Sequence, residues 1–117
     1  MDRGDIVLAR FPFTDGSGTR LRPVLVLAEI PGAYPDFIVL FISSQLHQAT
    51  PGVDLVLDST HQAFAMSGLK VPSVIRIGKV ASLSSGLMVG PLGHLELTGF
   101  NEVVRRLVRL IESGRYP

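Results

Sequence analysis

Apolar runs divide the first five-sixths of the chain into short segments with the pattern of β-strands. Three runs are nearly continuous in apolar residues, which is typical of strands buried on both faces or at a subunit contact: Asp5–Phe11, Pro23–Glu29 and Phe37–Ile42. Shorter runs predict further strands: Val53–Leu57, Ser73–Val80, Leu87–Val89 and Leu92–Leu97. The 12 Gly and 8 Pro residues lie almost entirely between these runs. This pattern favours a mainly β fold, a small barrel that closes its own edges rather than an open sheet.

Near residue 98 the apolar period changes from that of a strand to that of a helix. One apolar stripe has the spacing of a single helical face: Phe100, Val103, Val104, Leu107, Leu110 and Ile111. Thr98 is the expected N-terminal cap and Gly114 the expected stop. The stripe must lie against the barrel or against a second subunit.

Two connections between strands are candidates for function. The segment Pro12–Leu21 is a ten-residue, Gly/Ser/Thr-rich link between two apolar strands. A hairpin needs only about two to five residues there, so the surplus suggests a binding or gating loop, or else a plain surface loop. The polar segment Ser43–Gly52 directly follows a predicted buried strand.

Length and composition indicate one folded domain, residues 1–117. Hydrophobic residues make up 46% of the chain and the mean hydropathy is +0.37, which excludes disorder and hints at a subunit interface. No apolar run approaches the ~18 residues of a membrane span, and the charged start has no visible signal peptide. The absence of cysteine excludes disulfides and thiol chemistry and suits the reducing cytoplasm.

The net charge of +1 hides a segregation of charge along the chain. Residues 31–69 contain three Asp and no Lys or Arg, whereas the segment from Lys70 to Lys79 contains three cations and no acid. Arginines then outnumber glutamates in the predicted helix and the residues after it. This distribution permits a face that binds a polyanion, although a solvated surface with accidental clustering explains it equally well.

The common catalytic sets are absent from the sequence. His47, His61 and His94 are scattered, which disfavours a metal centre. The segment 16–18 lacks the Lys and helix of a phosphate loop, and no nucleophile elbow of the GxSxG type occurs. Arg22 remains as a candidate, because Pro23 fixes its backbone and a guanidinium fork matches phosphate oxygens. An Arg at a strand start is otherwise a solvated cap.

Several motifs, in order along the chain, resemble the PemK/MazF family of bacterial toxins. They are Gly4-Asp5-Ile6-Val7-Leu8, Phe11-Pro12-Phe13-Thr14-Asp15, Arg22-Pro23-Val24-Leu25-Val26-Leu27, Ile42-Ser43-Ser44-Gln45 and Pro72-Ser73-Val74-Ile75-Arg76. The resemblance spans about Gly4 to Glu112 and includes the terminal helix. It implies an SH3-like barrel with a C-terminal helix, a homodimer, and a metal-independent, cofactor-free endoribonuclease. It further implies that the protein cleaves single-stranded RNA and that a cognate antitoxin inhibits it.

The resemblance also implies roles for individual residues. Arg22, Ser43 and Arg76 match positions that act in catalysis, and Gln45 matches a position near the substrate. Further expected substrate contacts are Ser17, Thr19, Arg20, Ser44 and Lys79. Phe11, Phe13 and Phe37 are expected to be core or dimer contacts, because the few aromatic residues do not suggest extensive base stacking.

The chemistry implied for these residues uses the RNA's own 2′-hydroxyl as the nucleophile. Arginine guanidinium groups and a serine hydroxyl would stabilise charge on the attacked phosphate, and the products would be a 2′,3′-cyclic phosphate and a 5′-hydroxyl. An arginine suits a proton donor or electrostatic clamp better than a base at neutral pH, so the acceptor of the 2′ proton is left open.

Four features keep alternatives open. Gly78 stands where the PemK branch has an Asp, and segment 16–20 lacks the acid common in the MazF branch, with Asp15 the nearest available. Arg76 could instead pair with Asp54 or Asp58, and Ser43 could be a plain turn residue. The alternative functions are a non-enzymatic, CcdB-like poison of DNA gyrase and a silent barrel that binds only antitoxin or RNA.

Overall fold

The computed structural model describes residues 1–12 and 19–115. Six strands, three short 3-10 helices and one α-helix follow one another along the chain: β1 (Asp5–Pro12), β2 (Thr19–Ile30), β3 (Asp36–Ser43), η1 (Leu46–Gln48), β4 (Leu55–Leu57), η2 (Ala65–Ser67), β5 (Ser73–Ser84), η3 (Ser85–Leu87), β6 (Met88–His94) and α1 (Leu97–Ser113). The strands form one antiparallel sheet in the order β4-β5-β3-β2-β1-β6. The predicted class, mainly β with a C-terminal helix, is confirmed.

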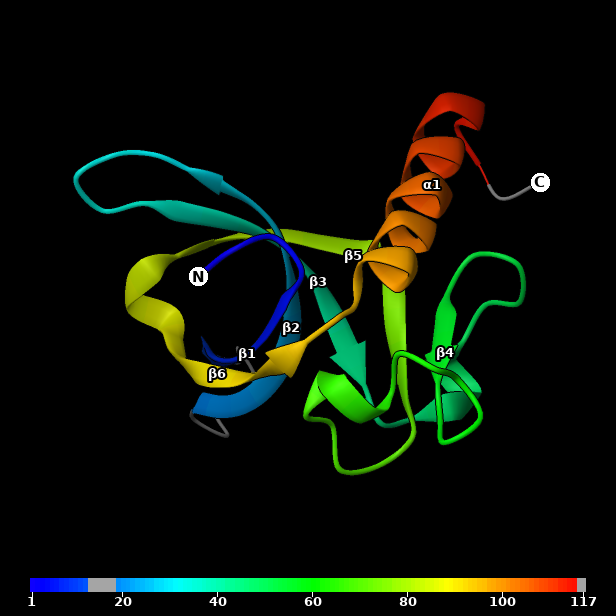
Figure 1. Cartoon of the computed structure of the whole chain (residues 1–117). Helices are drawn as coiled ribbons and strands as arrows, with labels where there is room; N and C mark the ends of the chain where they lie inside the picture. Colours follow the sequence, from blue (N-terminus) through cyan, green and yellow to red (C-terminus); the bar gives the residue numbers. More distant parts are fainter. Residues whose placement is uncertain (13–18, 116–117) are drawn as a thin grey trace.

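The sheet curls strongly, with α1 against one side (Figure 1), but it is not closed into a full ring. β4 and β6 are its two edges, and no ladder joins them within residues 1–12 and 19–115. Both edges are poor templates for further pairing: β4 has only 3 residues and β6 contains Pro91, which has no N–H to donate. The sequence predicted a barrel that closes its own edges, but the sheet instead has two open edges, one on a short strand and one on a strand that contains proline.

The central strands are buried on both faces, as their continuous apolar runs predict. One hydrophobic cluster lies between the sheet, α1 and the segment 53–69, and includes Ile6, Leu25 and Phe100. The second lies on the other face and includes Val7, Val24 and Phe37. The alternation of odd and even positions along each strand supplies the two clusters.

Several predicted boundaries differ from the structure. β2 begins at Thr19 and pairs with β1 as far as Pro12, so the predicted loop Pro12–Leu21 is partly strand, and its centre lies outside the described residues. The two predicted strands Leu87–Val89 and Leu92–Leu97 are one strand, β6, because Pro91 is tolerated at an edge. β4 begins only at Leu55, since the preceding residues form a turn on the Thr50 carbonyl.

Helix α1 begins earlier than predicted. Glu96, not Thr98, is the N-terminal cap, and its Oε1 accepts a hydrogen bond of 2.8 Å from the Gly99 amide. Gly114 ends the helix as expected, with a φ of 76° that favours glycine. The 17-residue helix is amphipathic, and no helix in the described part of the chain is long and apolar enough to cross a membrane.

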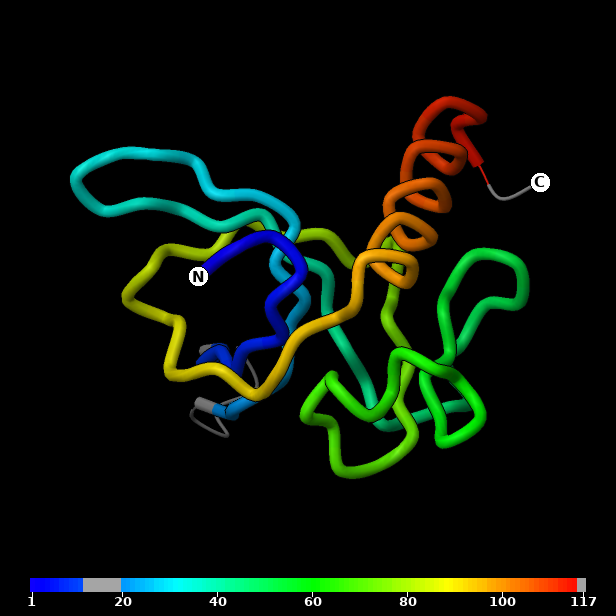
Figure 2. The backbone as a smooth tube through the Cα atoms, in the orientation of Figure 1, coloured from blue at the N-terminus to red at the C-terminus, as the bar shows by residue number. Residues whose placement is uncertain are grey.

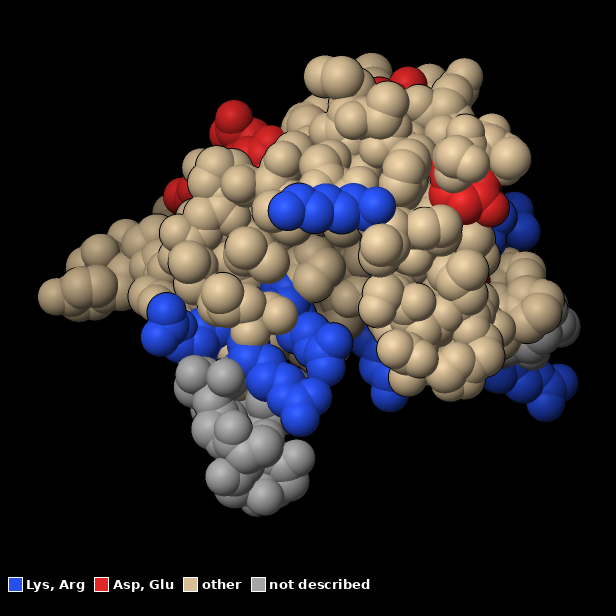
Figure 3. Space-filling view, turned by 90° about the horizontal axis from the view of Figure 1, so that it is seen from below, with Lys and Arg blue, Asp and Glu red and all other residues tan. Residues whose placement is uncertain are grey.

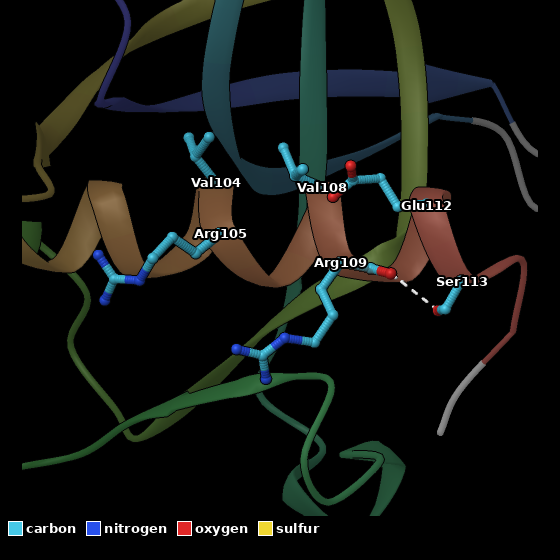
Figure 4. Close-up of a pocket in the computed structure, with 6 residues that line it drawn as sticks. All are labelled: Val104, Arg105, Val108, Arg109, Glu112 and Ser113. Atoms are coloured by element: carbon cyan, nitrogen blue, oxygen red, sulfur yellow. Dashed lines mark hydrogen bonds between the residues drawn. The ribbon is translucent and has the colours of Figure 1, made fainter.

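The apolar stripe of α1 becomes more exposed toward the end of the helix, although Val104, Leu107 and Leu110 still pack against the first hydrophobic cluster. Phe100 and Val103 are buried, whereas Ile111 is 69% exposed. Along the second half runs a shallow cavity of about 680 Å³, lined by Val104, Arg105, Val108, Arg109, Glu112 and Ser113. In Figure 4 the two valines point to one side of the helix and the two arginines to the other. This half of the helix is therefore an amphipathic surface.

The long connection between β3 and β5 packs against the rest of the fold by a close backbone approach (Figure 2). A Cβ at Gly93 of β6 would lie 2.4 Å from the carbonyl carbon and oxygen of Ser67, and one at Gly68 would lie 2.0 Å from the Leu92 oxygen. Only glycines allow the two backbones to meet this closely. This contact anchors the connection whose first half reaches the candidate site.

Candidate active site

The three predicted catalytic residues converge on one open cavity of about 650 Å³. Arg22 reaches it from β2, Ser43 from the end of β3 and Arg76 from β5. The complete described lining is Phe11, Arg22, Phe41, Ile42, Ser43, Gln45, Gln48, Arg76 and Lys79. We call this cavity the cationic groove.

Strand register explains why Arg22 and Ser43 meet. Val24 of β2 pairs with Phe41 of β3 in an antiparallel ladder. Extending this register by two residues, toward the start of β2 and the end of β3, places Arg22 opposite Ser43. Both then lie on the same face as Val24 and Phe41, because side chains alternate along a strand. The groove thus continues the face of the second hydrophobic cluster, and the Phe11 and Phe41 rings, with centroids 4.8 Å apart, form its apolar wall.

A local irregularity in β5 brings two more cations to the groove. Ile42 of β3 pairs with Ile75, but Leu40 pairs with Val80, so four β5 residues, 76–79, stand opposite Phe41. In a regular strand, residues 76 and 79 would point to opposite faces. The bulge lets both Arg76 and Lys79 line the groove.

Ser43 has the geometry of a turn residue and keeps a hydrogen to donate. Its Oγ accepts a 3.0 Å hydrogen bond from the Gln45 amide, which is the turn role expected of a serine at a strand end. A hydroxyl that accepts one bond still carries its own O–H donor. The turn role and a role toward a ligand in the groove are therefore compatible.

Arg76 forms the ion pair that the sequence allowed. Its Nε lies 3.1 Å from Asp54 Oδ2, and its Nη1 donates a 3.2 Å hydrogen bond to Gln48 Oε1. Asp58, the other acid considered, is exposed to solvent at the surface, where hydrogen bonds from the Thr60 hydroxyl and amide lower its pKa. The pairing with Asp54 does not withdraw Arg76 from the groove, which it still lines.

The groove favours an anionic ligand. Its described lining includes the cations Arg22, Arg76 and Lys79 and no His, Asp or Glu. Lys and Arg side chains gather on the face seen in Figure 3, the side toward which β3 runs in Figure 1. Across residues 1–12 and 19–115, no group of three His, Cys, Asp or Glu side chains could hold a metal ion. Guanidinium groups around a hydroxyl suit the nonbridging oxygens of a phosphodiester.

The remaining predicted contacts are distributed more widely. Gln45 lines the cationic groove, whereas Ser44 lines a neighbouring cavity of about 340 Å³ that also touches Arg22. Arg20 is exposed on β2 opposite Phe11, and Thr19 begins the strand opposite Pro12. Ser17 lies outside the described residues, as does Phe13.

Sequence reasoning did not assign four of the groove residues to the site: Phe11, Phe41, Ile42 and Gln48. Phe11, expected to be a core or dimer contact, packs against the second hydrophobic cluster and also lines the groove. Gln48 lies three residues after Gln45 in the polar segment that follows β3. This second glutamine in the segment was the sequence signal that could have identified Gln48 as a site residue. Phe41 lies two residues after Val39, on the same inward face of β3, and this position also fits an ordinary core residue. Phe37 is buried, as expected of a core residue.

Comparison with solved structures finds the same fold in mycobacterial toxins. The Mycobacterium tuberculosis toxin MazF-mt6 aligns with a TM-score of 0.69 at 18% identity, over 92% of this chain and 96% of that one. An endoribonuclease in complex with its cognate antitoxin, from Mycobacterial species, aligns with a TM-score of 0.67 at 13% identity, over 98% and 97%.

Sequence comparison assigns the family. A search among curated proteins finds no match to the chain. The family model for the PemK-like, MazF-like toxin of type II toxin–antitoxin systems matches residues 2–111, nearly the whole chain. The chain therefore belongs to the PemK-like and MazF-like toxins of type II toxin–antitoxin systems.

Proposed function

We propose that this toxin is a metal-independent endoribonuclease that cleaves single-stranded RNA, including mRNA, in the cationic groove. The observation that carries the proposal is the meeting of Arg22, Ser43 and Arg76 in one cavity whose described lining has no acidic side chain. Lys79 and Gln45 add donors to the same lining. An RNA backbone supplies both the phosphate that such a lining attracts and the hydroxyl that can attack it.

The reaction needs no external nucleophile. The 2′-oxygen forms a bond to phosphorus as the bond from phosphorus to the 5′-oxygen breaks. The 2′ proton leaves to a base and the 5′-oxygen gains a proton, which gives a 2′,3′-cyclic phosphate and a 5′-hydroxyl. Because the described lining holds no His, Asp or Glu, the 2′ proton passes to solvent or to a group outside that lining.

The protein's part is to stabilise the charge that develops on the phosphate. Arg22 and Arg76 face the nonbridging oxygens, and Ser43 donates its hydroxyl hydrogen to one of them. A single donor positioned for such charge contributes about 3 kcal/mol to lowering the barrier. A guanidinium stays protonated at neutral pH, so Arg22 or Arg76 is suited to donate a hydrogen bond to the departing 5′-oxygen, which takes its proton from solvent.

Two protein partners complete the proposal. The first is a cognate antitoxin, supported by the mycobacterial structural relative that is complexed with its own antitoxin. An acidic antitoxin segment would occupy the cationic groove and exclude RNA. The second is another copy of the toxin, since the distal half of α1 exposes apolar side chains, with Val108 47% exposed. The substrate and antitoxin place this activity in the cytoplasm.

The test is cleavage of mixed-sequence RNA by the purified protein in excess chelator. Wild-type protein should cleave, and Arg22→Ala should lose about 10²- to 10³-fold in rate. Arg105→Ala is the matched control, because it removes an equal charge from the exposed face of α1, where Figure 4 shows Arg105 pointing away from the valines.

Four results would contradict the proposal. Cleavage that disappears in chelator would mean that a metal takes part. Equal rates for wild type and Arg22→Ala would remove the groove from the chemistry. Trapping of DNA gyrase without RNA cleavage would select the gyrase-poison alternative, and salt-sensitive RNA binding without product would select the silent barrel.

A further inference from the structure

Asp54 is a buried carboxylate just outside the cationic groove, and each of its oxygens is engaged. Its side chain is only 3% exposed. Oδ1 accepts a 2.8 Å hydrogen bond from the Ile77 amide, and Oδ2 accepts from the Thr50 amide at 2.8 Å and from Arg76 Nε at 3.1 Å. A buried carboxylate is costly unless paired and hydrogen-bonded, so this arrangement needs all three donors.

These contacts fix the orientation of the Arg76 guanidinium. Asp54 accepts a hydrogen bond from its Nε, and Gln48 accepts one from Nη1 at 3.2 Å, so two of the three guanidinium nitrogens are held. Within the described residues, Nη2 has no protein partner, and Arg76 lines the groove. A guanidinium carries five N–H donors in a fixed plane, so holding Nε and Nη1 sets the direction of the Nη2 donors.

Helix α1 is hydrogen-bonded to the backbone at Asp54. Arg106 Nη1 donates to the carbonyl oxygens of Asp54 at 2.6 Å and Val53 at 3.2 Å, while Arg106 Nη2 lies 3.1 Å from Glu102 Oε1. The terminal helix thereby connects through Arg106 and Asp54 to Arg76. This chain of contacts joins three segments that are distant in the sequence: α1, residues 48–54 and β5.

We propose that Asp54 is a positioning residue that holds the Arg76 guanidinium in its orientation toward the scissile phosphate. The proposal rests on the proposed ribonuclease function. Asp54 acts through Arg76 and not as the base, because both its oxygens are occupied and it does not line the groove. Asp54 is the carboxylate that contacts Arg76.

The kinetic test compares Asp54→Asn, Arg76→Ala and the double variant by single-turnover cleavage at saturating RNA. Asp54→Asn should slow cleavage about 10- to 100-fold, the range for losing a residue that orients a functional side chain. RNA affinity should change by less than about threefold, because Arg22 and Lys79 remain to bind phosphate. Rates are compared at a temperature where circular dichroism shows each variant to be folded.

The double variant separates positioning from a merely structural role. If Asp54 acts through Arg76, Asp54→Asn has no further effect on the rate once Arg76 is alanine. A structural role would instead slow cleavage equally in both backgrounds and would overturn the proposal. Asp58→Asn is the matched control, since Asp58 lies on the surface and bonds Thr60 rather than an arginine. It should cleave at the wild-type rate.

A second measurement tests the positioning without relying on cleavage. In nitrogen-15 spectra of the wild-type protein, the Arg76 Nε–H should give a distinct resonance protected from exchange with water, and Asp54→Asn should abolish that protection. An unprotected Nε–H in wild type would overturn the proposal. If the Arg76 Nε–H is protected but the wild-type protein does not cleave RNA, the contact between Asp54 and Arg76 is demonstrated. The proposed function, and with it the catalytic role of that contact, would then be overturned.

Discussion

Replacing Ser43 by alanine removes one hydroxyl that has two separable roles. In the folded protein, Ser43 Oγ accepts a 3.0 Å hydrogen bond from the Gln45 amide. Gln45 is exposed, so its amide can turn to water when the hydroxyl is lost. The cost to stability should therefore be about 0.5 kcal/mol, the low end for a hydrogen bond, which lowers the melting temperature by roughly 2–4 °C in a domain of this size.

The same substitution should affect cleavage much more strongly. A hydrogen bond to a charged phosphate oxygen contributes about 1.5–3 kcal/mol, which corresponds to a rate loss of about 10- to 150-fold. The assay is single-turnover cleavage of a labelled RNA, with melting measured on the same preparations. Ser43→Thr keeps the hydroxyl and should stay within about threefold of wild type. Wild-type cleavage by Ser43→Ala, or equal losses in both variants, would refute a donor role for the hydroxyl.

Three further predictions concern stability and the departure at position 78. Gly93→Ala should destabilise the fold by ~3 kcal/mol in urea titrations, because its Cβ would meet the Ser67 backbone at 2.4 Å. Gly78→Ala, whose Cβ would meet nothing within 4 Å, is the control, and equal losses would disprove the close approach. Gly78→Asp should fold for the same reason and cleave RNA faster at pH 7, because it adds a carboxylate beside the groove; a slower enzyme would contradict this. Partial burial raises the pKa of Asp5, but hydrogen bonds from the Asp2 amide and His94 outweigh it and leave the pKa below its ordinary value. This carboxylate therefore contributes stability that is present above about pH 4 and is lost as pH falls through the lowered pKa. Asp5→Asn should flatten the decline of the urea midpoint as the pH falls below about 4, and an unchanged slope would contradict the assignment.

The spacing of apolar residues along the sequence predicted the helix and the central strands. The period of α1 and the apolar runs of β1, β2 and β3 follow from burial, which repeats along a strand or helix. The joining of two predicted strands into β6 could not be seen, because Pro91 is acceptable only at a sheet edge, and topology decides where the edge lies. The cap at Glu96 was missed because serine, threonine, aspartate and asparagine are the residues preferred there.

Some features of the candidate site were likewise predictable from the sequence, whereas others depend on the tertiary structure. The resemblance pointed to Arg22, Ser43 and Arg76, and the register of β2 against β3 explains why the first two meet. The joint approach of Arg76 and Lys79 depends on the bulge at residues 76–79, for which the sequence has no distinctive signal beyond Gly78. The choice of Asp54 over Asp58 as the partner of Arg76 depends on where the long connection packs, which is a tertiary property.

The most direct test of the central claim, that the groove assists attack by the RNA's own hydroxyl, is a single atomic change in the substrate. The cleavage site is first mapped on an RNA that the wild-type protein cuts in chelator. The same RNA is then prepared with one 2′-deoxy nucleotide on the 5′ side of the scissile phosphate. The account predicts that this RNA is bound with unchanged affinity and remains intact, while the all-ribose RNA yields a 2′,3′-cyclic phosphate and a 5′-hydroxyl by mass spectrometry. Cleavage of the deoxy-substituted RNA at the same bond would contradict it.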